Sequence, residues 1–166
     1  KSFQAREDQP VISEFMASND TTLADADGQY SDWIEIYNPS ANDINLAGWH
    51  LTDDKASLTK WTFPEVTIPG GQYLIVWASD KFPSQPGGQL HTNFKLSAGG
   101  EYLALVRPDG LTIVTEYEFS QQYPDISYGL SPGAGEVRFF ATPTPGAGNS
   151  TDYWDIVSDT KFSVNR

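Results

Sequence analysis

The sequence contains no cysteine among its 166 residues. Catalysis by a thiolate, disulfide bonds and zinc sites with thiolate ligands are therefore excluded. The absence does not fix a cellular compartment, because many exported bacterial proteins fold without disulfides.

Positive charge is also scarce, with ten Lys and Arg against 22 Asp and Glu, which gives a net charge of -12. Such a surface repels a phosphate backbone, so we expect no nucleic-acid partner and no binding to anionic lipid. No apolar run is long enough for membrane insertion, and we expect no signal peptide within these residues. We expect the chain to be a piece of a larger exported protein.

Apolar residues make up 39% of the sequence and aromatic residues 13%, a composition typical of a folded globular chain. The length suits one domain with a core of its own. The predicted organisation is an N-terminal linker over residues 1–9, a domain over residues 10–149, and a C-terminal linker or the start of a following module over residues 150–166.

An acidic loop leads into the clearest strand of the chain. Two isoleucines of residues 32–37 share one face of this expected strand. The other face carries Trp33, Glu35 and Tyr37, which is the period of a half-buried strand. Asn38-Pro39 then ends it, because proline removes a ladder donor.

Short segments rich in β-forming residues recur along the chain, separated by turn signals. The segments predicted to be extended are 11–16, 44–51, 58–63, 73–78, 101–107, 111–119, 126–130 and 137–140. The apolar run 73–78 is expected to be a central strand buried on both faces. No segment shows a helical period over two turns. The predicted class is all-β, a sandwich or a barrel.

The order of landmarks resembles the lamin tail domain family in its bacterial form. The motifs that carry the resemblance are Val11-Ile-Ser-Glu14, Asp27-Gly28, Asp32-Trp-Ile-Glu-Ile-Tyr-Asn38, Leu46-Ala-Gly-Trp49, Trp61-Thr-Phe-Pro64, Gly71 to Trp77, Leu90 to Leu96 and Pro143-Thr-Pro-Gly146. The resemblance implies an immunoglobulin-like β-sandwich of two mainly antiparallel sheets. It also implies an interaction module that sits, in bacterial relatives, inside large exported or cell-surface proteins. Residues 160–166 resemble the opening of a chitobiase C-terminal-type module.

The acidic loop is the candidate metal site. Asp25, Asp27 and Asp32 supply carboxylates, Gln29 offers a backbone carbonyl, and Gly28 permits a sharp bend, so the loop could hold part of a Ca²⁺ shell. The alternative is a loop whose Asp side chains cap their own backbone, with the glycine in a left-handed conformation.

The two histidines, His50 and His91, offer a conceivable metal or acid–base pair. Because its neighbours in the alternating strand face inward, His50 is expected to point to solvent. His91 is expected in a loop before a strand. Ordinary structural or surface roles are therefore favoured for both.

No catalytic constellation emerges from the remaining residues. No Asp or Glu lies in a sequence context that marks a raised pKa. Ser127 and Ser131 lack the glycines of a nucleophile elbow, and Gly87-Gly88 and Gly99-Gly100 lack the strand-to-helix setting of a phosphate loop. We expect no enzymatic activity.

Trp33 and Tyr37 are the candidate ligand-binding residues, since two rings on one face could stack on a sugar or anchor a protein. The alternative is that both rings fill a core. Glu35 between them would then need a partner such as Arg107 or Arg138.

The function expected from these patterns is a non-catalytic interaction or adhesion module of an exported or cell-surface bacterial protein, monomeric in isolation. The expected partner is a protein or another surface molecule. The alternatives are a carbohydrate-binding module that uses exposed Trp or Tyr, and an inert spacer. No cofactor is expected apart from the Ca²⁺ of the acidic loop.

Overall fold

The computed structural model describes residues 8–81, 88–133 and 135–155. In these ranges the chain forms twelve strands and no helix, so the predicted all-β class is confirmed. It follows that no helix of the described chain has the length and apolarity of a membrane span. In chain order the strands are β1 (Val11–Met16), β2 (Asp32–Tyr37), β3 (Ile44–Asn45), β4 (His50–Thr52), β5 (Trp61–Thr62), β6 (Thr67–Ile68), β7 (Tyr73–Ala78), β8 (Leu90–His91), β9 (Glu101–Val106), β10 (Ile113–Phe119), β11 (Ser127–Leu130) and β12 (Val137–Phe140).

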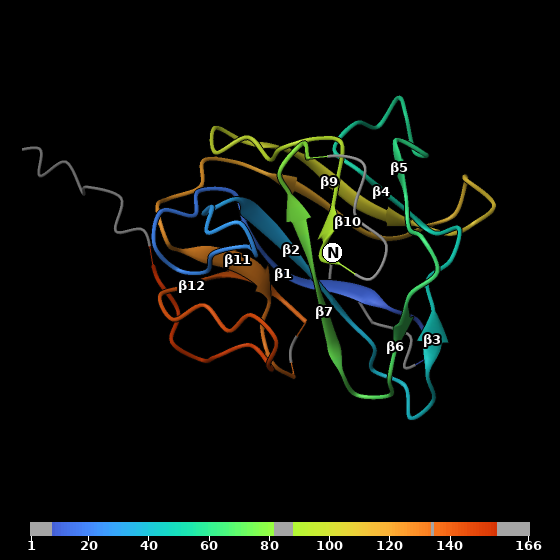
Figure 1. Ribbon diagram of the computed structural model, residues 1–166. Helices are drawn as coiled ribbons and strands as arrows, with labels where there is room; N and C mark the ends of the chain where they lie inside the picture. The colour runs from blue at the N-terminus through green and yellow to red at the C-terminus, as the bar shows by residue number, and fades with distance from the viewer. Residues whose placement is uncertain (1–7, 82–87, 134, 156–166) are drawn as a thin grey trace, which may run out of the picture.

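The strands form two main sheets and a small ribbon (Figure 1). The larger sheet has the order β12-β11-β1-β2-β7-β8, the second has the order β10-β9-β4-β5, and β3 pairs with β6. All the named pairs are antiparallel except β7 with β8. This is the immunoglobulin-like sandwich that the resemblance implies.

The core lies between the two main sheets. Phe15 of β1 packs against Tyr117 and Phe119 of β10, with ring centroids 5.1 and 4.8 Å apart. Both isoleucines of β2 belong to the same buried cluster, as the alternation predicts. The opposite face of β2 is therefore the outer face of the six-stranded sheet.

A β-bulge in β1 decides which of its side chains face the core. The register with β2 shifts between Ile12 and Glu14, so that Ile12 and Phe15 both face inward although they are three positions apart in the sequence. The bulge brings the carbonyl of Ser13 so close to β11 that a Cβ at Gly129 would lie 2.1 Å from it. Only glycine fits there, and Glu14 is left on the outer face.

Two irregular segments cover the outer face of the six-stranded sheet. In the first segment, residues 17–31, Leu23 packs against a buried cluster of Met16, Trp33 and Trp77. In the second, residues 142–149, backbone N–H groups of Thr144 and Gly146 donate to the two glutamates of β1 and β2. The outer face is thus buried without a third sheet.

Several predicted strands differ from the observed ones. Residues 44–51 divide into parts of β3 and β4 with a turn between them, and residues 58–63 contribute only the two residues of β5. Only the second half of the segment 73–78 is fully buried. Residues 1–7 and 156–166 fall outside the described residues, and with them the segment 160–166 that resembles another module.

Candidate functional site

The acidic loop is closed by its own side chains and one lysine. The buried carboxylate of Asp25 accepts hydrogen bonds from the backbone N–H groups of Asp27 (2.9 Å) and Gln29 (3.0 Å). Lys81 Nζ lies 2.6 Å from Asp25 and 3.1 Å from Asp27. Gly28 has a φ of 76°. The self-capping alternative is confirmed.

The electrostatics of this loop follow from these contacts. Burial acts to raise the pKa of Asp25, but the hydrogen bonds from Lys81 and from the amides of Gln29 and Asp27 outweigh it and lower that pKa. The hydrogen bonds that Lys81 donates to Asp25 and Asp27, together with the charges of these two carboxylates, raise the pKa of Lys81. A single lysine therefore offsets part of the negative charge of the loop.

The other two proposed calcium ligands are engaged elsewhere. The carbonyl of Gln29 accepts the backbone N–H of Asp25 (2.8 Å), and Asp32 Oδ2 accepts the N–H of Leu96 (3.1 Å). Burial raises the pKa of Asp32 to about 6, against that hydrogen bond and the charge of Lys95. Across the described ranges, no three His, Asp or Glu side chains converge as metal ligands.

The proposed aromatic platform on β2 is not exposed. Trp33 is fully buried against Met16 and Trp77, so its predicted availability to a ligand is wrong. The reason is the segment 17–31, which covers this part of the outer face. Tyr37 is half-buried and stacks on Tyr73, with centroids 4.6 Å apart.

The histidines lie on different sheets. The expectation that His50 points to solvent is wrong, because its ring is buried and Nδ1 lies 2.9 Å from Thr62 Oγ1. His91 belongs to β8 rather than to a loop, and its Nδ1 lies 2.8 Å from Ser79 Oγ. Burial lowers the pKa of both imidazoles.

The outer face holds a pair of buried carboxyl groups that the sequence pattern does not predict. Glu14 of β1 and Glu35 of β2 are fully buried and stand opposite each other in the strand register. The expectation that Glu35 pairs with Arg107 or Arg138 is wrong. Its Oε1 accepts Ser13 Oγ (2.6 Å) and its Oε2 accepts the backbone N–H of Gly146 (2.7 Å).

Glu14 is bound in a similar way. Its Oε1 accepts Ser127 Oγ (2.5 Å) and the N–H of Thr144 (3.0 Å), and its Oε2 accepts Thr144 Oγ1 (3.0 Å). Burial raises the pKa of Glu14 despite these bonds. Burial also raises the pKa of Glu35 to about 8, with the charge of Glu14 adding to the effect.

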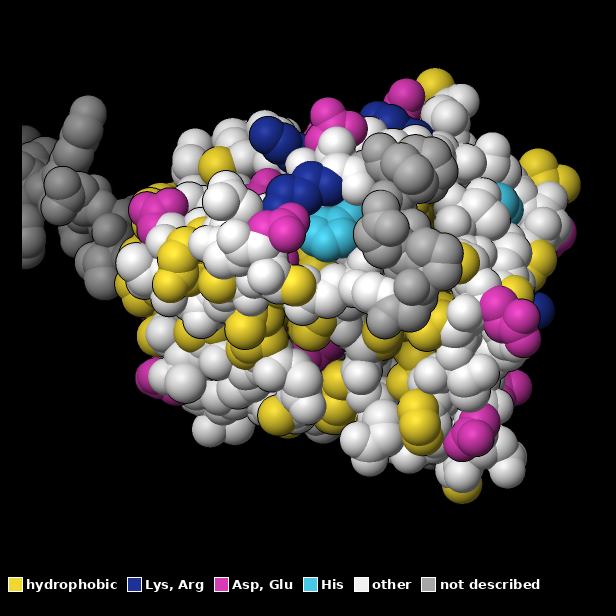
Figure 2. All heavy atoms as spheres, viewed as in Figure 1, with side chains coloured by type: hydrophobic (Ala, Val, Ile, Leu, Met, Phe, Trp, Pro, Cys, Tyr) yellow, Lys and Arg dark blue, Asp and Glu magenta, His cyan; other side chains and the backbone are white. Residues whose placement is uncertain are grey.

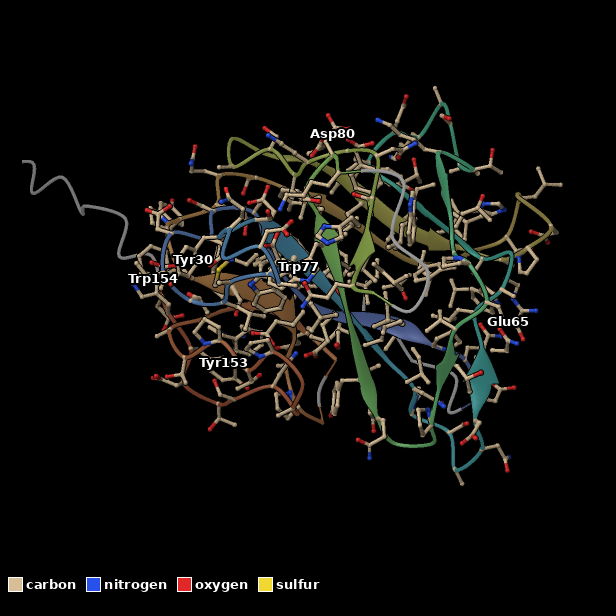
Figure 3. All side chains as sticks on the ribbon, in the orientation of Figure 1. Tyr30, Glu65, Trp77, Asp80, Tyr153 and Trp154 are labelled. Atoms are coloured by element: carbon tan, nitrogen blue, oxygen red, sulfur yellow. The ribbon has the colours of Figure 1, made fainter. Side chains whose placement is uncertain are left out.

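A group of half-buried aromatic rings lies at one end of the six-stranded sheet, and we call Tyr123, Phe139 and Trp154 the aromatic surface. The ring of Trp154 lies 4.6 Å from that of Tyr123 and 5.8 Å from that of Phe139. Figure 3 places Trp154 at the same end of the molecule as Tyr30, which is 49% exposed. Hydrophobic side chains gather on that side in Figure 2.

The family model described as Lamin Tail Domain matches residues 4–121, which is more than half of the chain. The chain belongs to the lamin tail domain family. No curated protein sequence matches it.

In this lamin tail domain, the folded unit continues past the matched residues. β11 pairs with β1, and β12 pairs with β11, so both complete the larger sheet. The chain then returns along β12, where the N–H of Ala141 donates to the carbonyl of Asp152 and the N–H of Trp154 to that of Phe139. The aromatic surface and the covering segment 142–149 therefore lie entirely beyond the residues that the family model matches.

Proposed function

We propose that this lamin tail domain is a non-catalytic docking module of a larger exported or cell-surface bacterial protein. It binds a protein partner through the aromatic surface of Tyr123, Phe139 and Trp154. Membership of an immunoglobulin-like, non-enzymatic family supports the module. Because the chain has no cysteine, an oxidising exterior would form no disulfide bond in it.

The aromatic surface is the observation that carries the proposal. Tyr and Trp supply large contact areas at a low entropic cost and dominate the binding energy of many protein interfaces. The three rings are half-buried, so packing holds them in place while part of each remains accessible. They are rigid anchors on a strongly acidic molecule, which favours a partner whose docking face is apolar with a basic rim.

The ring angles favour a protein over a sugar as the partner. The plane of Trp154 lies at 60° to that of Tyr123 and at 84° to that of Phe139. A sugar ring stacks on one flat, open aromatic face, whereas three tilted rings in mutual contact present a ridged apolar surface against which protein side chains can pack. Trp33 takes no part in either case, because it is fully buried.

A binding experiment on the folded chain tests this proposal. The immobilised chain is exposed to surface proteins of the source cells and, separately, to a glycan array. A retained protein should be lost with Trp154→Ala and kept with Leu111→Ala, which removes a 78% exposed leucine of the β9–β10 turn. Glycan binding lost with Trp154→Ala would favour the carbohydrate-binding alternative. Retention of neither ligand class would favour the spacer.

A further inference from the structure

Residues 142–149 are held on the outer face mainly through the two buried glutamates. The backbone N–H of Thr144 donates to Glu14 and that of Gly146 to Glu35. Asn149 Nδ2 adds bonds to the carbonyls of Ser13 and Leu130, each 2.8 Å long. The carboxyl groups are thus the sites at which the backbone of this segment is fastened to the sheet.

Each carboxyl group also has a hydroxyl partner. Ser127 Oγ contacts Glu14, and Ser13 Oγ contacts Glu35. A hydroxyl can donate to a carboxylate or accept from a carboxylic acid, whereas a backbone N–H only donates. Both glutamates can therefore be either ionised or protonated here without rearrangement of the strands.

No positive charge among the described neighbours pairs with the two glutamates. On β12, Arg138 stands opposite Gly129, but its guanidinium lies near Glu136 and Asp155. From β11 the neighbouring group is the hydroxyl of Ser127.

The other elements packed against the pair contribute no cation either. On β7, Ile75 stands opposite Glu35, and the titratable neighbour is Tyr73, whose own pKa is raised by burial and by the charges of Tyr37 and Glu35. Residues 142–149 contain no charged side chain. Two ionised carboxylates would therefore share a buried site with no compensating cation among the described residues.

We propose that Glu14, Glu35 and residues 142–149 form a proton-dependent clasp. The clasp is closed while the pair of carboxyl groups carries a proton, and it opens when both are ionised. The raised pKa values of the two glutamates agree with the geometry. Opening involves this segment rather than the strands, because β1 and β2 lie inside a six-stranded sheet with neighbours on both sides.

The physical reason for opening is solvation. A second negative charge in the pair needs water, and residues 142–149 are the covering segment whose removal would admit it. Neither Pro143 nor Pro145 has an N–H to donate, so few bonds need to break. The open state would uncover both glutamates. It would also uncover the hydroxyl of Tyr73, which lies close to Gly148: a Cβ placed on that glycine would be 3.3 Å from the hydroxyl oxygen.

Hydrogen exchange of the full chain, followed by NMR, tests the clasp. The measured quantity is the protection factor of the Thr144 and Gly146 amides at about pH 6 and about pH 9, which corrects for the intrinsic effect of pH on exchange. In the wild type, we expect the protection factors of these two amides to fall roughly tenfold or more from pH 6 to pH 9, while the β1–β2 amides stay protected. Glu35→Gln, which keeps the shape of the protonated acid, should hold the protection within about twofold. Glu65→Gln, at an exposed carboxylate, should behave as the wild type.

Equal protection of the two amides at both pH values, or the same fall in Glu35→Gln, would overturn the clasp. Should Glu35→Gln fail to fold, the carboxyl carbon of Glu35 in the wild type can be followed by its chemical shift. A midpoint above about pH 7 supports the proposal. A midpoint near the usual value of about 4.3 refutes it.

Discussion

The hydroxyl of Tyr117 on β10 donates a hydrogen bond of 2.6 Å to the carbonyl of Ile12 on β1 and so joins the two sheets through the core. The N–H of Ile12 donates in turn to Thr115 Oγ1 (3.3 Å). Ile12 lies next to the register shift in β1, and side chains of the opposite sheet bond to both of its backbone groups.

Replacing Tyr117 with phenylalanine should therefore destabilise the fold. The buried carbonyl of Ile12 would lose its donor, which costs about 1–3 kcal/mol. Urea denaturation measures the loss. Tyr102→Phe is the matched control, because its hydroxyl donates to the exposed Glu116 and the freed acceptor can bind water. Equal stability of Tyr117→Phe and the wild type would contradict this account of the inter-sheet bond.

Stability is predicted to fall as the pH rises from about 5 to about 8. Burial raises the pKa of Asp32 to about 6 and that of Glu35 to about 8. Between the ordinary and the raised values the folded chain binds more protons than the unfolded chain, so each rise in pH favours unfolding. Urea denaturation across this window should show a loss on the order of a few kcal/mol.

The variant Glu35→Gln should flatten that pH dependence, because it removes the group with the highest raised value. Stability that increases from pH 5 to pH 8 in the wild type would refute the prediction.

Below about pH 4 the stability is instead expected to decrease as the pH falls. Hydrogen bonds from Thr112 and from the N–H of Leu111 lower the pKa of Asp109 to about 2, so its contribution is lost as the pH falls toward that value.

Calcium should leave the melting temperature unchanged, because Lys81 already pairs with Asp25 and Asp27. A ligand that binds the native state raises that temperature by mass action. The comparison is a thermal melt with added Ca²⁺ and with chelator. An increase with Ca²⁺ that disappears in Asp25→Asn would restore the calcium hypothesis.

The same ion pair predicts the effect of removing its cation. Lys81→Ala should cost about 1–3 kcal/mol, because the buried carboxylate of Asp25 loses its partner. Lys55→Ala removes the exposed pair with Glu118 and should cost at most about 0.5 kcal/mol. Equal losses in the two variants, measured by urea denaturation, would contradict the assigned difference in burial.

Truncation should show that the folded unit extends beyond the family match. A chain that ends at residue 121 lacks β11 and β12 and leaves one side of β1 unpaired, so it should not unfold cooperatively. A chain that ends at residue 155 should match the full chain in circular dichroism melts. A cooperative melt of the shorter chain at the wild-type temperature would contradict this prediction.

The sequence predicts best where four or more β-forming residues in a row are bounded by turn signals. Residues 11–16, 32–37 and 137–140 form strands with the predicted bounds. The two-residue strands β6 and β8 are too short to show any period and were missed.

Side-chain contacts across long separations could not be predicted from the sequence. Glu14 and Glu35 meet only through the register of β1 with β2, and they are buried by Thr144, which lies 130 residues after Glu14. Lys81 reaches Asp25 across 56 residues. Trp33 follows the alternation correctly, but which outer-face rings remain open depends on where loops fold over the sheet.

The most direct test of the docking function measures partner binding and catalytic turnover on the same folded chain. The account predicts that the wild type retains a surface protein, that Trp154→Ala lowers the affinity by about 2 kcal/mol or more, and that neither protein turns over nucleotides, phosphoesters or glycans. Turnover that a point mutation abolishes, or binding that Trp154→Ala leaves unchanged, would contradict it.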